Sequence, residues 1–183
     1  MDHQNLTQSL FGVRRALIGM LHLGALPGSP GHREAVAALA ARAVEEARLY
    51  RDAGFHALVI ENMHDRPYLK GSVGPETVSS MAVIGHEVRR AVPLPLGVQV
   101  LAGANREAMA VALACGACFV RAVAAAVGVP TFVGSGVTPE NLERYPHADG
   151  FIVGSSVKRA GHWANALDAA SMKSLADAFA ALG

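Results

Sequence analysis

The sequence contains few charged residues. Lys, Arg, Asp and Glu make up 17% of the 183 residues, whereas about 25% is usual in globular proteins. Sixteen basic and fifteen acidic residues leave a formal charge of +1, and no basic block provides the surface that nucleic-acid binding requires. With 51% hydrophobic residues, the composition also excludes a disordered chain or a coiled coil. We therefore expect a globular protein that does not bind nucleic acid.

Long hydrophobic runs are missing as well. No run approaches the roughly 20 apolar residues that span a bilayer, so we expect no transmembrane segment. The N-terminus lacks the features of a signal peptide, because Asp2 has the wrong charge and no small-residue cleavage site follows an apolar stretch. We expect a cytoplasmic protein. Arg14 and Arg15 beside Phe11 leave a mitochondrial address as the alternative.

Cysteine is scarce, with two residues in the sequence. The two cysteines, Cys115 and Cys118, form a CxxC motif between a predicted helix and a predicted strand. Zinc sites usually combine two such pairs, and redox pairs lie at the start of a helix rather than at its end. The motif therefore favours packing over chemistry.

Short apolar runs bounded by Gly or Pro predict strands that are buried on both faces. Segments with one apolar helical stripe lie between them. This alternation predicts parallel βαβ units, and hence a doubly wound sheet or a (β/α) barrel. The predicted strands cover residues 17–21, 57–60, 96–100, 118–120, 131–133 and 150–153, and the clearest helical stripes cover 36–50, 78–88, 108–115 and 172–182.

One connection is too short for this plan. Only residues 122–130 separate the fourth predicted strand from the fifth, whereas a parallel crossover needs a dozen or more residues. Their sequence, AVAAAVGVP, reads like the last turns of a helix followed by the turn into a strand. We interpret residues 122–130 as the mark of a deletion.

Motifs along the chain carry a resemblance to a known family. The first predicted strand and its loop read GMLHL (19–23) and LPGSP (26–30), and in this order they resemble the BtpA family. The resemblance continues through further motifs, which are ENMHD (61–65), YLKG (68–71), VGPET (73–77), GVQVL (97–101), FVR (119–121), VGSGVT (133–138) and VGSSVK (153–158), followed by Asn165 and Asp168.

This resemblance implies a TIM barrel of the ribulose-phosphate-binding type, in a family named for a member implicated in photosystem I biogenesis. It makes residues 1–183 a single (β/α) barrel-type domain with an N-terminal extension over 1–15. Residues 16–121 resemble the first four strands, and residues 122–183 resemble the last two βα units. The expected fold class is α/β, a parallel barrel that is incomplete, with about six strands and without strands five and six. Gln99 stands where many members carry Asn.

Two Gly/Ser turns predict a phosphate site. The first is Gly134, Ser135 and Gly136, and the second is Gly154, Ser155 and Ser156. Glycine lets backbone N–H groups approach an anion closely, and barrels often bind phosphate with the loops after strands seven and eight, where the resemblance places these residues. The alternative is that both are tight turns, which need Gly and Ser in any case.

Polar residues at the ends of other strands are candidates for chemistry, because these ends gather at one mouth of a barrel. We predict Glu61 as a general base, His22 as an acid or base near neutral pH, and Arg121 as the holder of a second anionic group. The alternative is a polar layer that closes the barrel, with Glu61 paired to Arg121 or Lys70. Further mouth residues are Asn62, Asp65, Lys70, Gln99 and Lys158.

We expect no metal and no cofactor. His22, Glu61, His64 and Asp65 offer ligand atoms, but no HxxxH spacing fixes two of them on one helix face. Three functions stay open, and with them the question whether the protein is an enzyme. They are a BtpA-like phosphate-binding assembly or biogenesis factor for a membrane complex, an isomerase or lyase of a phosphorylated small molecule, and an inactive shortened barrel. Unpaired strand edges predict a homo-oligomer.

Overall fold

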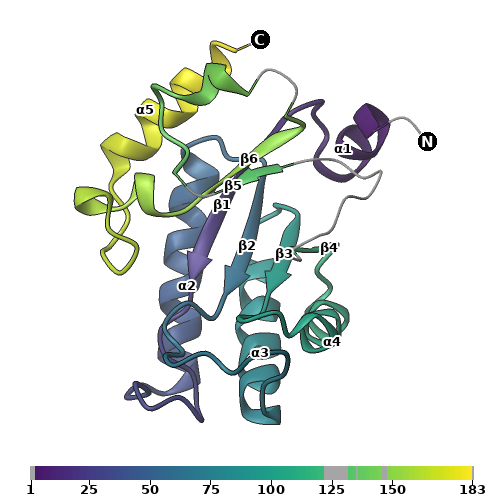
Figure 1. The fold of residues 1–183 in the computed structure, drawn as a ribbon, viewed down its shortest axis with the longest axis vertical. Helices are drawn as coiled ribbons and strands as arrows, with labels where there is room; N and C mark the ends of the chain where they lie inside the picture. The colour runs from purple at the N-terminus through teal and green to yellow at the C-terminus, as the bar shows by residue number, and fades with distance from the viewer. Residues whose placement is uncertain (1–2, 122–131, 135, 146–147, 183) are drawn as a thin grey trace.

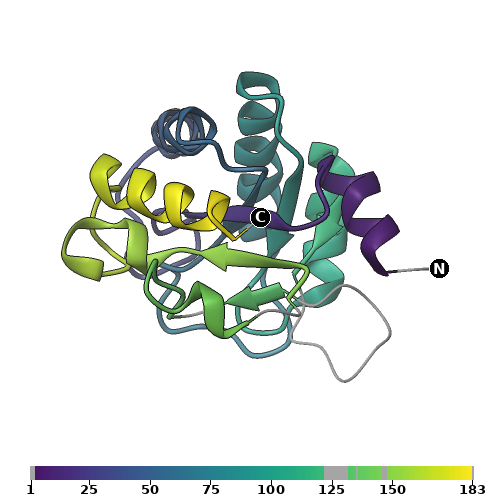
Figure 2. The same ribbon diagram turned by 90° about the horizontal axis from the view of Figure 1, so that it is seen from above.

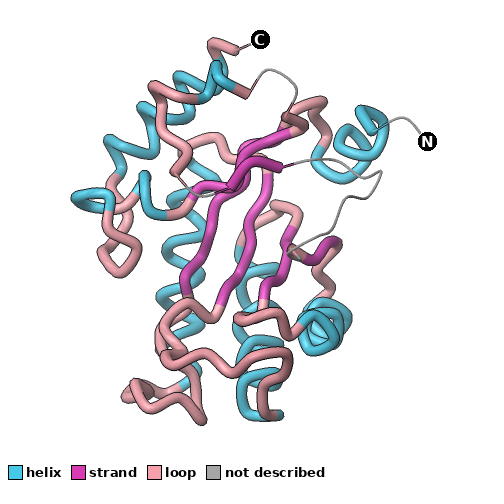
Figure 3. Tube along the Cα trace, in the orientation of Figure 1, coloured by secondary structure: helices cyan, strands magenta, loops and turns pink. Residues whose placement is uncertain are grey.

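A computed structural model describes residues 3–121, 132–134, 136–145 and 148–182. In these residues, short strands alternate with helices along the chain (Figures 1 and 3). The strands are β1 Ala16–His22, β2 Ala57–Glu61, β3 Leu96–Gln99, β4 Phe119–Val120, β5 Phe132–Gly134 and β6 Gly150–Val153. The α-helices are α1 His3–Phe11, α2 Val36–Asp52, α3 Pro75–Ala91, α4 Asn105–Cys115 and α5 Ala169–Ala180, and 3-10 turns occupy η1 Leu142–Arg144, η2 Ser155–Val157 and η3 Arg159–Gly161.

The strands form one parallel sheet in the order β4-β3-β2-β1-β6-β5. The sheet curls as part of a barrel does, with α2 to α5 around its outside (Figure 2). The last strand, β6, pairs with the first, β1, which is how a (β/α) barrel closes. The predicted fold class, a parallel and incomplete α/β barrel, is therefore confirmed. The interpretation of residues 122–130 as a deletion falls outside the described residues.

Helix boundaries follow local chemistry. Pro75 opens α3, where its missing N–H and fixed φ cost nothing. Asp168 caps α5, because its carboxylate accepts a hydrogen bond of 2.8 Å from the backbone N–H of Ser171. Gly116 ends α4 with a φ of 72°, a conformation that glycine adopts without strain. No helix in the described part of the chain is long and apolar enough to cross a bilayer.

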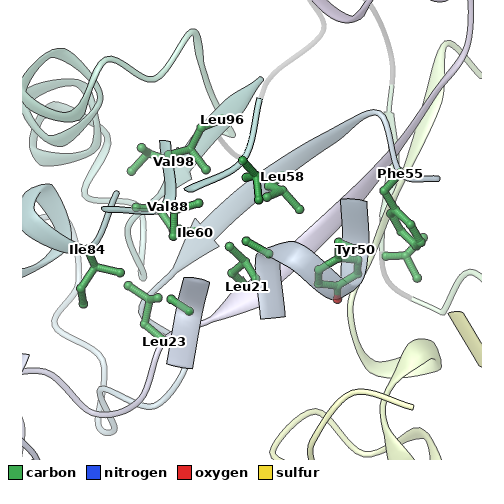
Figure 4. Packing of buried hydrophobic residues seen from close by; sticks show 14 of the residues in the cluster. Leu21, Leu23, Tyr50, Phe55, Leu58, Ile60, Ile84, Val88, Leu96 and Val98 are labelled. Carbon is green, nitrogen blue, oxygen red and sulfur yellow. The ribbon is translucent and has the colours of Figure 1, made fainter. Parts of the chain in front are cut away.

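The outer face of the sheet packs against the helices. Leu21, Leu58 and Ile60 point from β1 and β2 towards the apolar stripes of α2 and α3 (Figure 4), and each fully buried side chain of this kind contributes about 1.5–3 kcal/mol. The ring of Tyr50 lies directly against β1, and a Cβ at Gly19 would stand 2.5 Å from it. Gly19 therefore allows the helix and the strand to approach closely.

The inner face of the sheet is filled by α1 at the end where the strands begin (Figure 1). Phe11 is 8% exposed and belongs to a second apolar cluster with inward-facing residues of β1, β2 and β6. Its ring meets Phe119 edge to face at 5.3 Å and Phe132 at 5.7 Å. Because Phe119 lies on β4 and Phe132 on β5, one side chain joins the two edge strands of the sheet.

Candidate functional site

Strand alternation places four polar side chains in one row at the carboxyl ends of the strands. In β1 the inward residues Ile18 and Met20 are followed by His22, which pairs in register with Glu61 of β2. Glu61 in turn pairs with Gln99 of β3. Arg121 directly follows β4. His22, Glu61, Gln99 and Arg121 are called the polar row below.

The members of the polar row contact one another in sequence. His22 Nε2 lies 3.5 Å from Glu61 Oε2, and Arg121 Nη1 lies 3.5 Å from Glu61 Oε1. The same Arg121 nitrogen donates a hydrogen bond to Gln99 Oε1. At the other end, His22 Nδ1 lies 3.3 Å from the carbonyl oxygen of Trp163. A donor at Nδ1 satisfies that carbonyl and leaves the Nε2 lone pair facing Glu61.

Burial moves both titratable groups at the centre of the row towards their neutral forms. It lowers the pKa of His22 to about 4, with the positive charge of Lys158 as the next cause. It raises the pKa of Glu61 to about 6, against the opposing effect of Arg121. Near neutral pH the site thus holds a neutral imidazole and a carboxyl group that exchanges its proton just below neutrality. Such groups can transfer protons.

A cavity of about 350 Å³ opens above the row. The turns after β5 and β6 also line it, so predicted phosphate residues share this cavity with the predicted acid and base. Gly154 also makes room for the imidazole, because a Cβ there would lie 3.0 Å from His22 Cε1. The predicted residues that line the cavity are His22, Glu61, Gln99, Arg121, Gly136, Gly154, Ser155 and Ser156.

Two residues of the turn after β6 that line this cavity have backbone N–H groups without a partner in the described ranges. In η2 the N–H of Val157 donates to the carbonyl of Gly154 at 3.3 Å, but the N–H groups of Ser155 and Ser156 donate to no partner among the described residues. Gly134 ends β5 beside Arg121, whose Nη2 would lie 3.3 Å from a Cβ at that position. Ser135, the middle residue of the first predicted turn, lies outside the described residues.

Asn62 and Asp65 lie elsewhere and connect loops. Asn62 Oδ1 accepts a hydrogen bond of 2.7 Å from the N–H of Leu101, and its Nδ2 donates to Asp65 at 3.1 Å. Asp65 accepts a further bond of 2.7 Å from the N–H of Leu26. Both residues line a second cavity of about 240 Å³ beside the start of α3. They hold together the loops after the first three strands.

The two lysines predicted at the mouth do not line the first cavity. Lys158 is buried, and its Nζ lies 3.8 Å from Glu46 Oε2 on α2. Lys70 is exposed. Of the two residues predicted as partners of Glu61, Arg121 is the one that contacts it. Within the described residues, no three side chains of His, Cys, Asp or Glu gather as metal ligands do.

Sequence reasoning missed the apolar wall of the cavity. Met63, Tyr68 and Leu101 line it, and Tyr68 donates a hydrogen bond of 2.7 Å to the carbonyl of Met63. The sequence signal for this wall was Tyr68, an aromatic residue in the loop after β2, the strand that ends in the acidic residue Glu61. Trp163 was missed as the partner of His22, because a backbone carbonyl leaves no trace in the residue type.

Comparison with known proteins places the chain in a family. The sequence profile of the BtpA family matches residues 13–127 and 121–181. An uncharacterized protein of Pyrococcus horikoshii is 37% identical over 158 residues, which cover 82% of this chain and 60% of that protein. Photosystem I biogenesis protein BtpA of a Synechocystis species is 33% identical over 111 residues, which cover 61% of this chain and 39% of that protein.

A third relative is an uncharacterized mitochondrial protein of Caenorhabditis elegans. It is 41% identical over 114 residues, which cover 60% of this chain and 41% of the relative. The chain thus spans no more than 60% of the length of these three relatives. Its two matched segments nevertheless take in almost all of its own residues. The chain belongs to the BtpA family.

Proposed function

We propose that the protein binds a phosphorylated small molecule in the cavity above the polar row. The observation that carries this proposal is the pair of N–H groups at Ser155 and Ser156, which donate to no partner in the described part of the chain and belong to residues that line the same cavity as Arg121. Backbone N–H groups bind phosphate oxygens without the charge of a lysine. Arg121 adds a fixed positive charge, and its side chain is 31% exposed. The phosphate then lies on the turns after β5 and β6, and the rest of the ligand faces the polar row.

The biological role proposed with this site is assembly or biogenesis of a membrane complex. Its support is the similarity to the Synechocystis protein, which is named for photosystem I biogenesis. The proposed location is the cytoplasm, and the printed name of the worm relative supports a mitochondrion as the alternative.

A second candidate is an isomerase or lyase of a phosphorylated small molecule. The contact of 3.5 Å between His22 and Glu61 supports it, because both groups titrate below neutrality and face the cavity. Glu61 then removes a proton from the substrate and His22 assists at a neighbouring atom. Turnover in Glu61→Gln and His22→Asn separates this candidate from a binding function, since loss of one acid or base typically costs 10²–10⁴-fold.

Thermal-shift measurements with inorganic phosphate and with sugar phosphates test the binding function. A ligand that binds only the folded chain raises its melting temperature with concentration. The double variant Gly136→Asp, Ser155→Asp places negative charge where the anion is proposed to bind, and we expect it to lose the response. Gly71→Asp with Ser174→Asp is the matched control, because both positions are exposed and outside the cavity.

Two results would count against the proposal. If the parent does not respond to any phosphate compound, the third reading, an inactive shortened barrel, is favoured. If the variant with Asp at positions 136 and 155 responds as the parent does, the phosphate site lies elsewhere.

A further inference from the structure

One side-chain nitrogen of Arg121 lies near two acceptors, Gln99 and Glu61, but at different distances. Its Nη1 donates a hydrogen bond to the neutral side-chain carbonyl of Gln99, while Glu61 Oε1 stays 3.5 Å away, beyond the distance of a charge-assisted hydrogen bond. Gln99 is 6% exposed and stands opposite Glu61 in the register of β2 and β3. Arg121 is thus hydrogen-bonded to the uncharged amide of Gln99, and its contact with the Glu61 carboxylate is longer.

We propose that Gln99 is a positioning residue that holds Arg121 back from Glu61, and that the cavity therefore takes up a proton on Glu61 when it binds its anion. This inference rests on the proposed function of the cavity as a phosphate site. It adds a coupling between the ligand and a proton, and it assigns that coupling to one neutral side chain.

The surroundings of Glu61 explain why it is the proton acceptor. His22 faces it from β1 and Arg121 from the end of β4, and its negative charge contributes to raising the pKa of Tyr68 in the loop after β2. From the segment after β6, the positive charge of the buried Lys158 acts on His22, and Glu46 Oε2 lies 3.8 Å from Lys158 Nζ.

Arg121 is thus the nearest positive charge to the Glu61 carboxylate among the described residues, at 3.5 Å. With Glu61 itself 4% exposed, water screens its charge weakly. These contacts agree with a pKa that burial raises to about 6.

An anion in the same cavity adds a like charge to this carboxylate. It also attracts Arg121, whose Nη2 lies beside Gly134, towards the turns after β5 and β6. Both effects raise the proton affinity of Glu61. Linkage is reciprocal, so a lower pH raises the affinity for the anion until Glu61 is protonated in the free protein as well.

Calorimetric titration with sulfate tests the inference. Sulfate resembles phosphate but does not itself titrate in the relevant range, so any proton taken up belongs to the protein. Titrations in buffers of different ionisation enthalpy, from about pH 5 to about pH 8, give the number of protons bound with each sulfate. We expect a fraction of a proton per sulfate, with a maximum just above the pKa of free Glu61 and a decline towards lower pH.

Three variants assign the proton and the role of Gln99. Glu61→Gln should bind sulfate without proton uptake. Gln99→Met removes the amide at similar volume and lets Arg121 close on Glu61, so the uptake maximum should move to lower pH. Gln99→Glu adds a second carboxylate and should move the maximum to higher pH. The shift of Gln99→Met to lower pH distinguishes positioning from the mere loss of a polar neighbour, which would raise the proton affinity of Glu61. Gln99→Glu checks that the maximum follows the charge beside Glu61.

Each result of these titrations tests a different part of the proposal. Sulfate binding with no proton uptake in the parent overturns the inference and leaves the proposed anion site standing. Equal uptake maxima in the parent and in Gln99→Met overturn the positioning role. A parent that binds neither sulfate nor inorganic phosphate overturns the inference together with the proposed function. Circular dichroism of each variant establishes that it is folded before it is titrated.

Discussion

His22 Nε2 lies 3.5 Å from Glu61 Oε2, and only 6% of each side chain is exposed. Burial moves the two pKa values in opposite directions, from 6.5 to about 4 for His22 and from 4.5 to about 6 for Glu61. The folded protein therefore resists protonating His22 and resists ionising Glu61. The cost of burying His22 falls as the pH rises, whereas the cost of burying Glu61 rises with pH.

The first prediction concerns stability between pH 4.5 and 6. In this range the unfolded chain binds more protons at His22, so that residue makes the free energy of unfolding rise with pH. The folded chain binds more protons at Glu61, which makes it fall. In the parent, the effects of His22 and Glu61 on the pH dependence of the free energy of unfolding partly cancel. Relative to the parent, Glu61→Gln should gain about 1 kcal/mol from pH 4.5 to pH 6, and His22→Asn should lose about 2 kcal/mol.

Urea denaturation at several pH values across this range measures both differences. Opposite slopes for the two variants relative to the parent support the burial of both groups. If both variants keep the slope of the parent, neither group is held in its neutral form, and the description of the polar row is wrong.

The second prediction concerns the N-terminal helix. Phe11 contacts both Phe119 and Phe132, on the two edge strands, so Phe11→Ala leaves a cavity inside the curled sheet. We expect a loss of about 3–5 kcal/mol in the free energy of unfolding. Leu6→Ala on the same helix is the control, because Leu6 is 39% exposed. A loss for Phe11→Ala no greater than that of the control would mean that α1 does not fill the sheet.

The order of strands and helices could be predicted from the sequence because apolar runs bounded by Gly or Pro report burial directly. The row of His22, Glu61, Gln99 and Arg121 was also accessible, since each residue lies at or just beyond the end of an apolar run. The part played by Phe11 was not, because an aromatic residue in an N-terminal extension does not reveal which strands it meets. That contact depends on the curl of the whole sheet.

Three residues expected at the mouth show the limits of reasoning from strand ends. Asn62 follows Glu61 directly, and the period of two turns it away from the inner face. Asp65 follows in the same loop and bonds to Leu26. Lys158 comes after the η2 turn, which redirects it towards Glu46. Residues past the last paired position take their direction from loop geometry, which sequence spacing does not encode.

The third prediction concerns the buried ion pair of Lys158 and Glu46. Replacing Lys158 with Met leaves the Glu46 carboxylate without its partner at 3.8 Å, in a side chain that is 18% exposed. We expect a loss of about 3–5 kcal/mol at neutral pH. The double variant Lys158→Met, Glu46→Leu should lose less than the sum of the single variants, as a double-mutant cycle measures.

An exposed ion pair provides the control for this cycle. Lys173→Met removes a partner of Asp177 on α5, where the lysine side chain is 76% exposed, and it should hardly change stability. Strict additivity at Lys158 and Glu46 would contradict the proposed interaction between them.

The fourth prediction concerns association. β4 and β5 are the edges of the sheet in the described residues, and unpaired strand edges favour pairing with another chain. We expect oligomers that grow with concentration in size-exclusion chromatography with light scattering. A chimera that carries the middle segment of a longer family member between β4 and β5 should be monomeric and should melt at a higher temperature. A monodisperse monomer that melts cooperatively and is as stable as the chimera would contradict this prediction.

The central claim is that the cavity binds a phosphate group on the turns after β5 and β6. An NMR titration of the ¹⁵N-labelled protein with inorganic phosphate tests it most directly, because each backbone N–H reports separately. We predict saturable shifts at the amides of Gly136, Ser155 and Ser156 and at the side chain of Arg121, with little change on the outer helices. Saturable shifts elsewhere, or none at these residues while the protein stays folded, would contradict the claim.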